Sequence, residues 1–364
     1  MTTLGQEPSA LDRVPVTIPR RMRALVKTSP SRGFEITDAP VPVPGRGDVL
    51  VKVSAGGICG TDLHIYRWDP WAQSRIRPPL VIGHEFCGTV VAVGEDVNAV
   101  RVGDRIAGEC HLACGWCGRC RHGQPHICER LKIVGVDRDG AFAEYVVLPA
   151  PNAWRLDPAI PWNIAAIMDP LGNAVHTALA TDLTTATVAV IGCGPIGLMA
   201  IPVSRMAGAA LVVASDVRPN RLALARRMGA DVVVDASREP VAERLRALTD
   251  GQGVDVVLEM SGHAAGIRDA LRGVRSGGWV GLLGLPSAPV ELDLANSIIF
   301  KAVRVEGIFG RRMWQTWEQM TVLLRRGLDV SPVITHRLPL DRFDEAFALL
   351  ESGEAGKVIL TLES

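Results

Sequence analysis

Val188–Gly197, which reads VAVIGCGPIG, is the stretch that decides the fold of this chain. A β-branched apolar run leads into the spacing G-x-G-x-x-G, and a helical pattern continues from Ile196 to Met206. Glycines in such a turn let the backbone approach a pyrophosphate closely, and the following helix offers free N–H groups at its N-terminus. The spacing alone is a weak signal, but its place between a strand and a helix favours a dinucleotide-binding turn over a glycine-rich structural turn.

Strand-like and helical runs keep alternating downstream of this turn. Five further strands are expected, over 211–214, 232–234, 254–258, 279–283 and 303–308, with helical runs such as 220–228 between them. This alternation predicts an α/β fold with a doubly wound parallel sheet of two three-strand halves. Leu183–Ser204 carries no charge and is long enough to span a membrane. Its glycines and prolines favour strand, turn and helix instead.

Asp216 closes the strand after the glycine turn and lies 19 residues beyond Gly197. A carboxylate there accepts hydrogen bonds from the ribose hydroxyls and repels a 2′-phosphate, so NAD is expected rather than NADP. Arg218 and Arg221 follow closely and weaken this preference slightly.

The remaining sequence divides around this nucleotide domain, which we expect over 171–313. Residues 22–170 are rich in short apolar runs, such as 49–53 and 89–93, separated by Gly and Pro. They predict a second, β-rich domain, which the tail 314–364 is expected to complete. Residues 1–21 are polar and lack the apolar run of a secretory signal, so they are interpreted as an extension.

Four cysteines, Cys114, Cys117, Cys120 and Cys128, stand within fifteen residues. Four thiolates make a closed tetrahedral zinc site that leaves no position for a substrate, so this zinc is expected to be structural. A ferredoxin cluster usually has a last gap of three and a following Pro, whereas here the gap is seven and Glu129 follows. A disulfide framework is typical of small secreted chains. A nucleic-acid-binding zinc ribbon would need a basic chain.

The composition is typical of a soluble globular protein that can bury large cores. The chain has 364 residues, 48% of them hydrophobic, and its 39 Lys and Arg balance 39 Asp and Glu. A net charge of zero favours neither nucleic acid nor an anionic membrane as a partner. Eight cysteines without a recognisable secretory signal indicate a reducing compartment, so a cytoplasmic location is expected.

A second metal cluster is predicted upstream of the four cysteines. Cys59, His84 and Glu85 offer the three ligands that an open, catalytic zinc site needs. A lone Cys and a lone His are as often core residues, so spacing alone leaves both interpretations open. Thr61 and His64, just after the Cys, favour the catalytic one.

The chain resembles the zinc-containing medium-chain dehydrogenases. The resemblance rests on Cys59 with Gly83-His84-Glu85, on the four cysteines and on the glycine turn. It is most specific over Cys59–Trp71, Asp169–Ala178 and Gly307–Arg311, and it covers nearly all of the chain after residue 21. It implies a GroES-like β-rich catalytic domain beside the Rossmann domain, NAD, two zinc ions per chain and a homotetramer.

The resemblance also implies roles for individual residues. Thr61 and His64 would pass a proton outward, and Asp169 would lie near the metal and tune it. His111 would lie near the substrate pocket. The implied cofactor positions are Gly192, Gly194, Ile196, Gly197, Asp216, Arg221, Leu283, Gly284, Leu285, Ile308 and Phe309. Cys193 stands where a smaller residue is usual and Phe309 where Tyr is common. Whether Glu85 binds zinc directly or lies beside it stays open.

Within the family, the resemblance is strongest to the branch that oxidises the secondary hydroxyl of L-threonine to 2-amino-3-oxobutanoate with NAD. One alternative has the same chemistry, a polyol or secondary-alcohol dehydrogenase of the sorbitol or butanediol type. Another belongs to a different class, a non-catalytic zinc protein that only binds a nucleotide. The presence of both Cys59 and His84 argues against that class.

Overall fold

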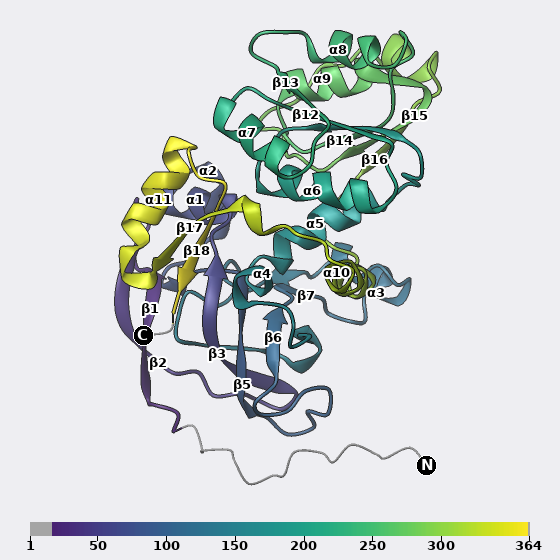
Figure 1. The fold of residues 1–364 in the computed structure, drawn as a ribbon. Helices are drawn as coiled ribbons and strands as arrows, with labels where there is room; N and C mark the ends of the chain where they lie inside the picture. Colours follow the sequence, from purple (N-terminus) through teal and green to yellow (C-terminus); the bar gives the residue numbers. More distant parts are fainter. Residues whose placement is uncertain (1–16, 363–364) are drawn as a thin grey trace, which may run out of the picture.

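The computed structural model describes residues 17–362, and these form two lobes packed side by side (Figure 1). The expected extension 1–21 lies for the most part outside the described residues, and the first strand, β1, begins at Arg21. None of the described helices is both long enough and apolar enough to cross a membrane.

The nucleotide lobe is built on a six-stranded, all-parallel sheet with the order β13-β12-β11-β14-β15-β16. The strands are β11 (Thr187–Ile191), β12 (Leu211–Asp216), β13 (Val232–Asp235), β14 (Val254–Glu259), β15 (Val274–Leu282) and β16 (Arg304–Gly307). Numbered within the lobe, the order is 3-2-1-4-5-6, that of a doubly wound dinucleotide fold. The predicted fold class is therefore confirmed, and each predicted strand overlaps an observed one.

Helices connect these strands and cover the sheet (Figure 1). They are α6 (Pro195–Met206), α7 (Pro219–Arg227), α8 (Val241–Ala247) and α9 (Ala264–Gly273), with a π-helical turn at Ala295–Ile299 before β16. The uncharged segment 183–204 contains β11, the glycine turn and most of α6. Buried Val and Ile on the strands face apolar helix side chains, as expected for a sheet covered on both faces.

The second lobe contains a larger mixed sheet with the order β10-β6-β5-β3-β18-β17, and β9 also pairs with β3. Its strands are β3 (Asp48–Gly57), β5 (Glu85–Val93), β6 (Arg105–Gly108), β9 (Tyr145–Pro149), β10 (Ala153–Arg155), β17 (Ile334–Pro339) and β18 (Lys357–Thr361). Smaller sheets comprise β1 (Arg21–Lys27), β2 (Glu35–Pro40) and β4 (Leu80–Val81), and β7 (His111–Leu112) with β8 (Lys132–Ile133).

Short helices decorate this lobe. They are α1 (Gly60–Arg67), α2 (Pro70–Arg75), α3 (Gly118–Arg121), α4 (Trp162–Ala165), α10 (Gln315–Arg325) and α11 (Phe343–Ser352). Helix α5 (Met168–Ala178) is almost entirely buried and runs between the lobes (Figure 1).

One hydrophobic core crosses the boundary between the lobes. It joins Ala55 and Cys87 of the mixed sheet to Leu171 of α5 and Leu198 of α6. Trp317 of α10 is fully buried in the same core. Because a close-packed interior resists deformation, this shared core holds the two lobes in a fixed position relative to each other.

Candidate active site

Cys59, His84 and Glu85 meet in one place, as predicted. Their ligand atoms all lie within 4.8 Å of one another. Cys59 is the N-cap of α1, Glu85 is the first residue of β5, and His84 directly precedes that strand. Gly83 has a φ of +95°, and a Cβ there would collide with Phe142, so only glycine brings His84 to this position without strain.

Asp62 joins this cluster although the sequence analysis did not single it out. It is fully buried, and its Oδ2 accepts a hydrogen bond of 2.8 Å from the backbone N–H of Cys59. Its Oδ1 lies 3.4 Å from Nδ1 of His84. A carboxylate behind a metal-binding histidine orients the ring and makes it a better ligand. The sequence signal that could have identified Asp62 was its position three residues after Cys59.

Lys357 is the second residue of the cluster that was missed. It is buried on β18, its ammonium contacts Oε2 of Glu85, and it donates a 2.8 Å hydrogen bond to the carbonyl of Ile58. Gly57 pairs with Glu85 across the sheet, and a side chain at that glycine would collide with the Glu85 carboxylate. Burial raises the pKa of Glu85, and the nearby ammonium offsets only part of this rise.

The charges in this cluster suit a cation. Burial would lower the pKa of His84, but the negative charges of Asp62 and Cys59 raise it well above its usual value. Asp62 and Lys357 are the charged neighbours of His84 Nδ1 and Glu85 Oε2, and within the described residues neither atom makes a hydrogen bond of regular geometry. A thiolate, an imidazole and a carboxylate in this arrangement are a donor set for zinc. The residues therefore fit a catalytic zinc, with Glu85 shared between metal and lysine.

Thr61 and His64 lie one turn apart on α1. The hydroxyl of Thr61 is 3.7 Å from Sγ of Cys59, next to the metal cluster. The side chain of His64 is 56% exposed, and its Nδ1 contacts the Asp69 carboxylate, which the sequence analysis did not select. Asp69 is also the N-cap of α2, where its side chain accepts from Ala72 N–H. Thr61 and His64 thus connect the metal cluster to the surface, and Asp69 orients the His64 ring.

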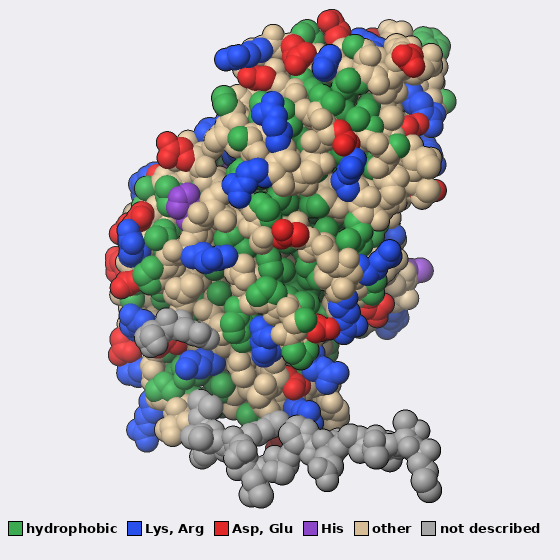
Figure 2. Space-filling view, in the orientation of Figure 1, with side chains coloured by type: hydrophobic (Ala, Val, Ile, Leu, Met, Phe, Trp, Pro, Cys, Tyr) green, Lys and Arg blue, Asp and Glu red, His purple; other side chains and the backbone are tan. Residues whose placement is uncertain are grey.

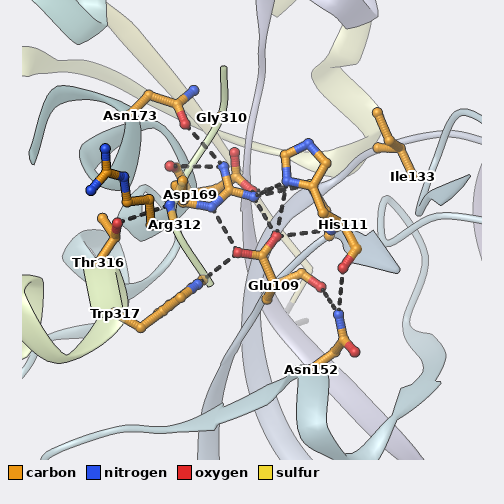
Figure 3. A network of polar contacts seen from close by, with 12 residues as sticks. Glu109, His111, Ile133, Asn152, Asp169, Asn173, Gly310, Arg312, Thr316 and Trp317 are labelled. Atoms are coloured by element: carbon orange, nitrogen blue, oxygen red, sulfur yellow. Dashed lines mark hydrogen bonds and ion pairs between the residues drawn. The ribbon is translucent and has the colours of Figure 1, made fainter. Parts of the chain in front are cut away.

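Asp169 and His111 belong to one buried polar network (Figure 3). Its centre is Arg311, which is fully buried and was not predicted as a site residue. Arg311 Nε and Nη2 donate to the two carboxylate oxygens of Glu109 at 2.9 and 2.5 Å. Nη2 also lies 2.8 Å from Asp169 Oδ1, and Cys110 donates to that same oxygen at 3.1 Å.

The ligand atoms of Glu109, Cys110 and His111 lie as close together as those of a metal site. The guanidinium of Arg311 already supplies the positive charge there, so we assign this group to the network and not to a third metal. Burial is the main cause of the raised pKa of Glu85, and the charge of Asp169 raises it further, which places Asp169 near the cluster of Cys59, His84 and Glu85.

The four predicted lobe cysteines converge as a second group. Their sulfur atoms lie within 4.8 Å of one another, with Cys117 Sγ 3.5 Å from Cys120 and 3.8 Å from Cys128. Backbone N–H groups point at the sulfurs: those of Cys114 and Arg130 at Cys128, and that of Cys117 at Cys114. Backbone N–H groups of Cys120 and Glu129 lower the pKa of Cys117 to about 6. This lobe fits a closed structural zinc.

The glycine turn lies at the carboxyl edge of the parallel sheet. Gly192 has a φ of +95°, and a Cβ there would lie 2.7 Å from Ser261. Gly197 packs against the carbonyl of Gly192, whereas a Cβ at Gly194 would meet open space. No side chain caps the N-terminus of α6, so its N–H groups remain free for a phosphate.

The other predicted cofactor residues border the same edge. Asp216 ends β12, its carboxylate accepts from the N–H groups of Cys193 and Arg218, and Arg221 lies 3.6 Å from it. Leu285 follows β15 and is 88% exposed, and Phe309, after β16, is 47% exposed. The remaining members are Ile196, Leu283, Gly284 and Ile308. Exposed apolar side chains beside an uncapped helix suit the flat rings of a dinucleotide.

Comparisons with known proteins agree with this geometry. Residues 45–158 match the alcohol dehydrogenase GroES-like domain, and residues 195–326 match the zinc-binding dehydrogenase domain. The chain is 51% identical to an L-threonine 3-dehydrogenase from Symbiobacterium thermophilum, over 93% of this chain and 97% of that protein.

Solved structures agree as well. An alcohol dehydrogenase from Escherichia coli CFT073 complexed with NADH superposes with a TM-score of 0.87 at 30% identity, over 94% of this chain and 100% of that one. A zinc-binding dehydrogenase from Sinorhizobium meliloti 1021 bound to NADP gives 0.87 at 32%, over 94% and 99%. Sequence and fold thus lead to one conclusion: the chain belongs to the zinc-containing medium-chain alcohol dehydrogenase family.

Proposed function

We propose that this enzyme oxidises the secondary hydroxyl of L-threonine to 2-amino-3-oxobutanoate and reduces NAD to NADH. The observation that carries the proposal is the convergence of Cys59, His84 and Glu85 beside a proton path that starts at Thr61. The substrate follows from the relatives named L-threonine 3-dehydrogenase, which share about half of their residues with this chain across nearly their whole length.

Two groups that the protein binds would supply the chemistry. Zinc held by Cys59, His84 and Glu85 would polarise the substrate hydroxyl, and the nicotinamide would accept the hydride. Asp62 orients His84 from behind, and Asp169 adds negative charge beside the cluster. The four lobe cysteines would hold the second, structural zinc.

The proton leaves through this chain's own residues. Thr61 places a hydroxyl next to the metal cluster, and His64 lies one turn further along α1 at the surface. An imidazole gains and loses protons near neutral pH, which suits the last step of such a path. The Asp69 carboxylate holds the His64 ring in place.

NAD is the proposed cofactor, although one structural neighbour binds NADP and another NADH. Asp216 is 8% exposed at the end of β12, where the ribose of a bound dinucleotide would lie. Two of its acceptor positions are used by backbone N–H groups, and the others remain for hydroxyls.

NADH formation with L-threonine, compared with sorbitol, 2,3-butanediol and L-serine, tests the proposal. We expect L-threonine to give by far the highest kcat/KM, and Cys59→Ala to abolish turnover with every substrate. Turnover with a polyol alone would identify a polyol dehydrogenase instead. A folded, zinc-loaded protein that binds NAD and turns over none of the four would favour a non-catalytic function.

We propose further that 22–170, completed by 314–364, forms the catalytic domain and that 171–313 forms the nucleotide domain. A homotetramer is proposed as well. Its support is the free edge of β16, near which Leu294, Ile299 and Phe300 are exposed. Light scattering during gel filtration should give four times the chain mass for the native protein and a smaller species for Phe300→Asp.

The enzyme is proposed to act in the cytoplasm on small molecules, without nucleic-acid or membrane partners. None of the eight cysteines, all of which lie in the described residues, forms a disulfide, which suits a reducing compartment. Acidic and basic side chains are interspersed over the face shown in Figure 2, so that face offers no single-sign field to a polyanion.

A further inference from the structure

Arg218 is a cationic residue beside the proposed ribose position, and the proposed function does not use it. It follows Asp216 by two positions, and its backbone N–H donates to the Asp216 carboxylate at 2.9 Å. Its side chain therefore begins next to the ribose. An arginine near this carboxylate can bind the 2′-phosphate of NADP, which would oppose the proposed preference for NAD.

The guanidinium of Arg218 is bound by the second lobe. Its Nη1 donates a 2.8 Å hydrogen bond to the carbonyl of Ser352, the last residue of α11. A Cβ at Gly353 would overlap Nη1 and Cζ of Arg218, so the guanidinium packs directly over this glycine. In Figure 1 the upper end of α11 lies below α7 of the nucleotide lobe. The contact therefore joins the two lobes.

Helix α11 has a physical reason to bind an arginine at this end. The last carbonyls of a helix lack partners within the helix and carry a partial negative charge. All residues of α11 are described, and none in its last turn is basic. Gly353 has a φ of +71°, and its N–H returns to the carbonyl of Leu350 at 3.1 Å. Arg218 supplies a hydrogen bond and a positive charge from the other lobe.

Asn220 holds the same loop by a second contact. Its side-chain amide donates to the carbonyls of Gly353 and Glu354, both at 3.1 Å. Two side chains from the loop between β12 and α7 thus bind three consecutive carbonyls of the second lobe. Because Asn220 keeps the loop against the end of α11, the Arg218 side chain stays within reach of Ser352.

The other arginines near the ribose position have carboxylate partners. Arg221 lies 3.6 Å from Asp216, and Arg238 lies 3.4 Å from Asp235. Asp216 and Asp235 are neighbours in the register of β12 and β13, so two carboxylates stand side by side at this edge. Two arginines balance these two carboxylates. Arg218 would be the cation in excess, and it is the one that α11 binds.

We propose that the C-terminal end of α11 is a determinant of cofactor specificity, which binds Arg218 and withholds it from the 2′-phosphate of NADP. The inference rests on the proposed function, in which NAD is the cofactor. NAD has a hydroxyl at this position and loses nothing when Arg218 is engaged elsewhere. NADP gains the arginine only if the bond to Ser352 breaks, and this cost lowers its affinity. The second lobe thus helps the nucleotide lobe to exclude NADP.

Equilibrium binding of adenosine 2′,5′-bisphosphate and of AMP tests the proposal, because the two ligands differ only in the 2′-phosphate. Gly353→Asn places a side chain where the guanidinium lies, and Asn tolerates the left-handed backbone there. We expect it to improve the binding of the bisphosphate relative to AMP about tenfold, the gain of one charge-assisted hydrogen bond. Calorimetric titration measures both constants. An unchanged ratio in Gly353→Asn would overturn the proposal.

Two further variants show whether the gain comes from Arg218. Gly353→Asn/Arg218→Met should lose it, and a gain that persists there would contradict the proposal. Gly47→Asn is the matched control, because Gly47 has a φ of +77° and a Cβ there meets open space. It should bind both ligands in the wild-type ratio. An equal gain in Gly47→Asn would show that the release of Arg218 is not the cause.

Arg218→Met alone tests the proposal without any change in α11. An arginine that is withheld contributes nothing to the 2′-phosphate, so the binding ratio should stay within about twofold of the wild-type value. If the bisphosphate loses affinity about tenfold relative to AMP, Arg218 already contacts the phosphate and the proposal fails.

Failure of this inference is distinguishable from failure of the proposed function, because the binding ratio does not depend on turnover. A wild type that does not oxidise L-threonine with NAD refutes the proposed function, while the two nucleotides still report on Arg218. A wild type that oxidises L-threonine with NAD, together with an unchanged ratio in Gly353→Asn, refutes only the inference.

Discussion

The ammonium of Lys357 contacts the carboxylate of Glu85 in the interior of the catalytic lobe. Burial would lower the pKa of Lys357, but the negative charges of Glu85, Cys59 and Asp62 outweigh burial and raise it. The Glu85 carboxylate therefore contacts the lysine and would also bind the catalytic zinc. The two cations compete for this carboxylate, and the competition can be measured.

Lys357→Met should destabilise the zinc-free enzyme strongly. It leaves the Glu85 carboxylate buried without a partner, which costs about 3–5 kcal/mol of unfolding free energy. Urea denaturation of protein stripped of its catalytic zinc measures the loss. In Glu85→Gln/Lys357→Met, which removes both charges, most of the stability should return. If the double variant is no more stable than Lys357→Met, the pair does not have the role assigned to it.

Asp62→Asn should weaken zinc binding at the catalytic cluster by about 10- to 100-fold, because the carboxylate behind His84 is lost while the shape is kept. Competition with a chelator, followed as zinc per chain, measures the affinity. Asp69→Asn is the matched control: it alters the partner of His64 and should leave zinc affinity unchanged. An equal loss in both variants would remove Asp62 from the metal site.

Cys117→Ser should remove the lobe zinc and lower thermal stability before it affects hydride transfer. Cys117 Sγ lies 3.5 Å from Cys120 Sγ and 3.8 Å from Cys128 Sγ, and its depressed thiol pKa, about 6, favours the thiolate that a metal needs. Metal analysis should fall by one zinc per chain. Cys193→Ala, at a buried thiol outside the lobe, should keep both zinc ions. A zinc-poor Cys117→Ser protein with native stability and activity would contradict a structural role.

Asp216→Ala should shift cofactor preference towards NADP. Losing the ribose hydrogen bonds should cost NAD about 10- to 100-fold in kcat/KM, while removal of the negative charge should improve the value for NADP. Arg221, 3.6 Å from the carboxylate, becomes available to a 2′-phosphate. Asp216→Ala/Arg221→Ala should therefore lose the gain with NADP. Unchanged NAD kinetics in Asp216→Ala would place the ribose elsewhere.

Glu109 should make stability depend on pH in the acid range. Burial raises its pKa, but the charge of Arg311 and the hydrogen bonds to Glu109 outweigh burial and hold the pKa far below its usual value of 4.5. Above about pH 4.5 the pairing contributes its full stability, and as the pH falls further the unfolded chain takes up a proton that the folded one refuses. Stability is therefore lost on acidification.

Urea midpoints measured from about pH 6 down to about pH 3.5 test this dependence. The wild type should fall more steeply over the lower part of the range than Glu109→Gln/Arg311→Met, in which neither charge exists. Zinc loss affects both proteins alike, so the difference between the two slopes isolates the pair. Parallel slopes would show that Glu109 does not contribute.

Local signals in the sequence account for what could be predicted. The strand before the glycine turn, the turn itself and the helix after it follow from periodicity and φ requirements within a few residues. The four cysteines come together through short loops, and one turn of helix α1 carries Thr61 and His64 directly after Cys59. The order of the six parallel strands follows from the same alternation, because doubly wound folds connect strands in few ways.

The residues that were missed act over long distances in the chain. Lys357 and Arg311 each neutralise a carboxylate that lies more than 200 positions upstream, and no local pattern marks a lysine or an arginine as buried. The thiol of Cys110 donates to Asp169, 59 positions downstream, which is another long-range contact. Strand pairing and the packing of α5 and α10 bring these residues into contact. The spacing of residues along the sequence does not reveal such contacts.

Strand β18 has a consequence for how the enzyme matures. It pairs with β3 in the middle of the catalytic sheet and carries Lys357 to Glu85. Because a ribosome makes the chain from its N-terminus, every metal ligand is synthesised before the strand that completes their surroundings. Glu85 lacks its ion-pair partner, Lys357, until almost the whole chain has been synthesised. The catalytic lobe therefore cannot finish folding during translation, whereas the parallel sheet is complete by then.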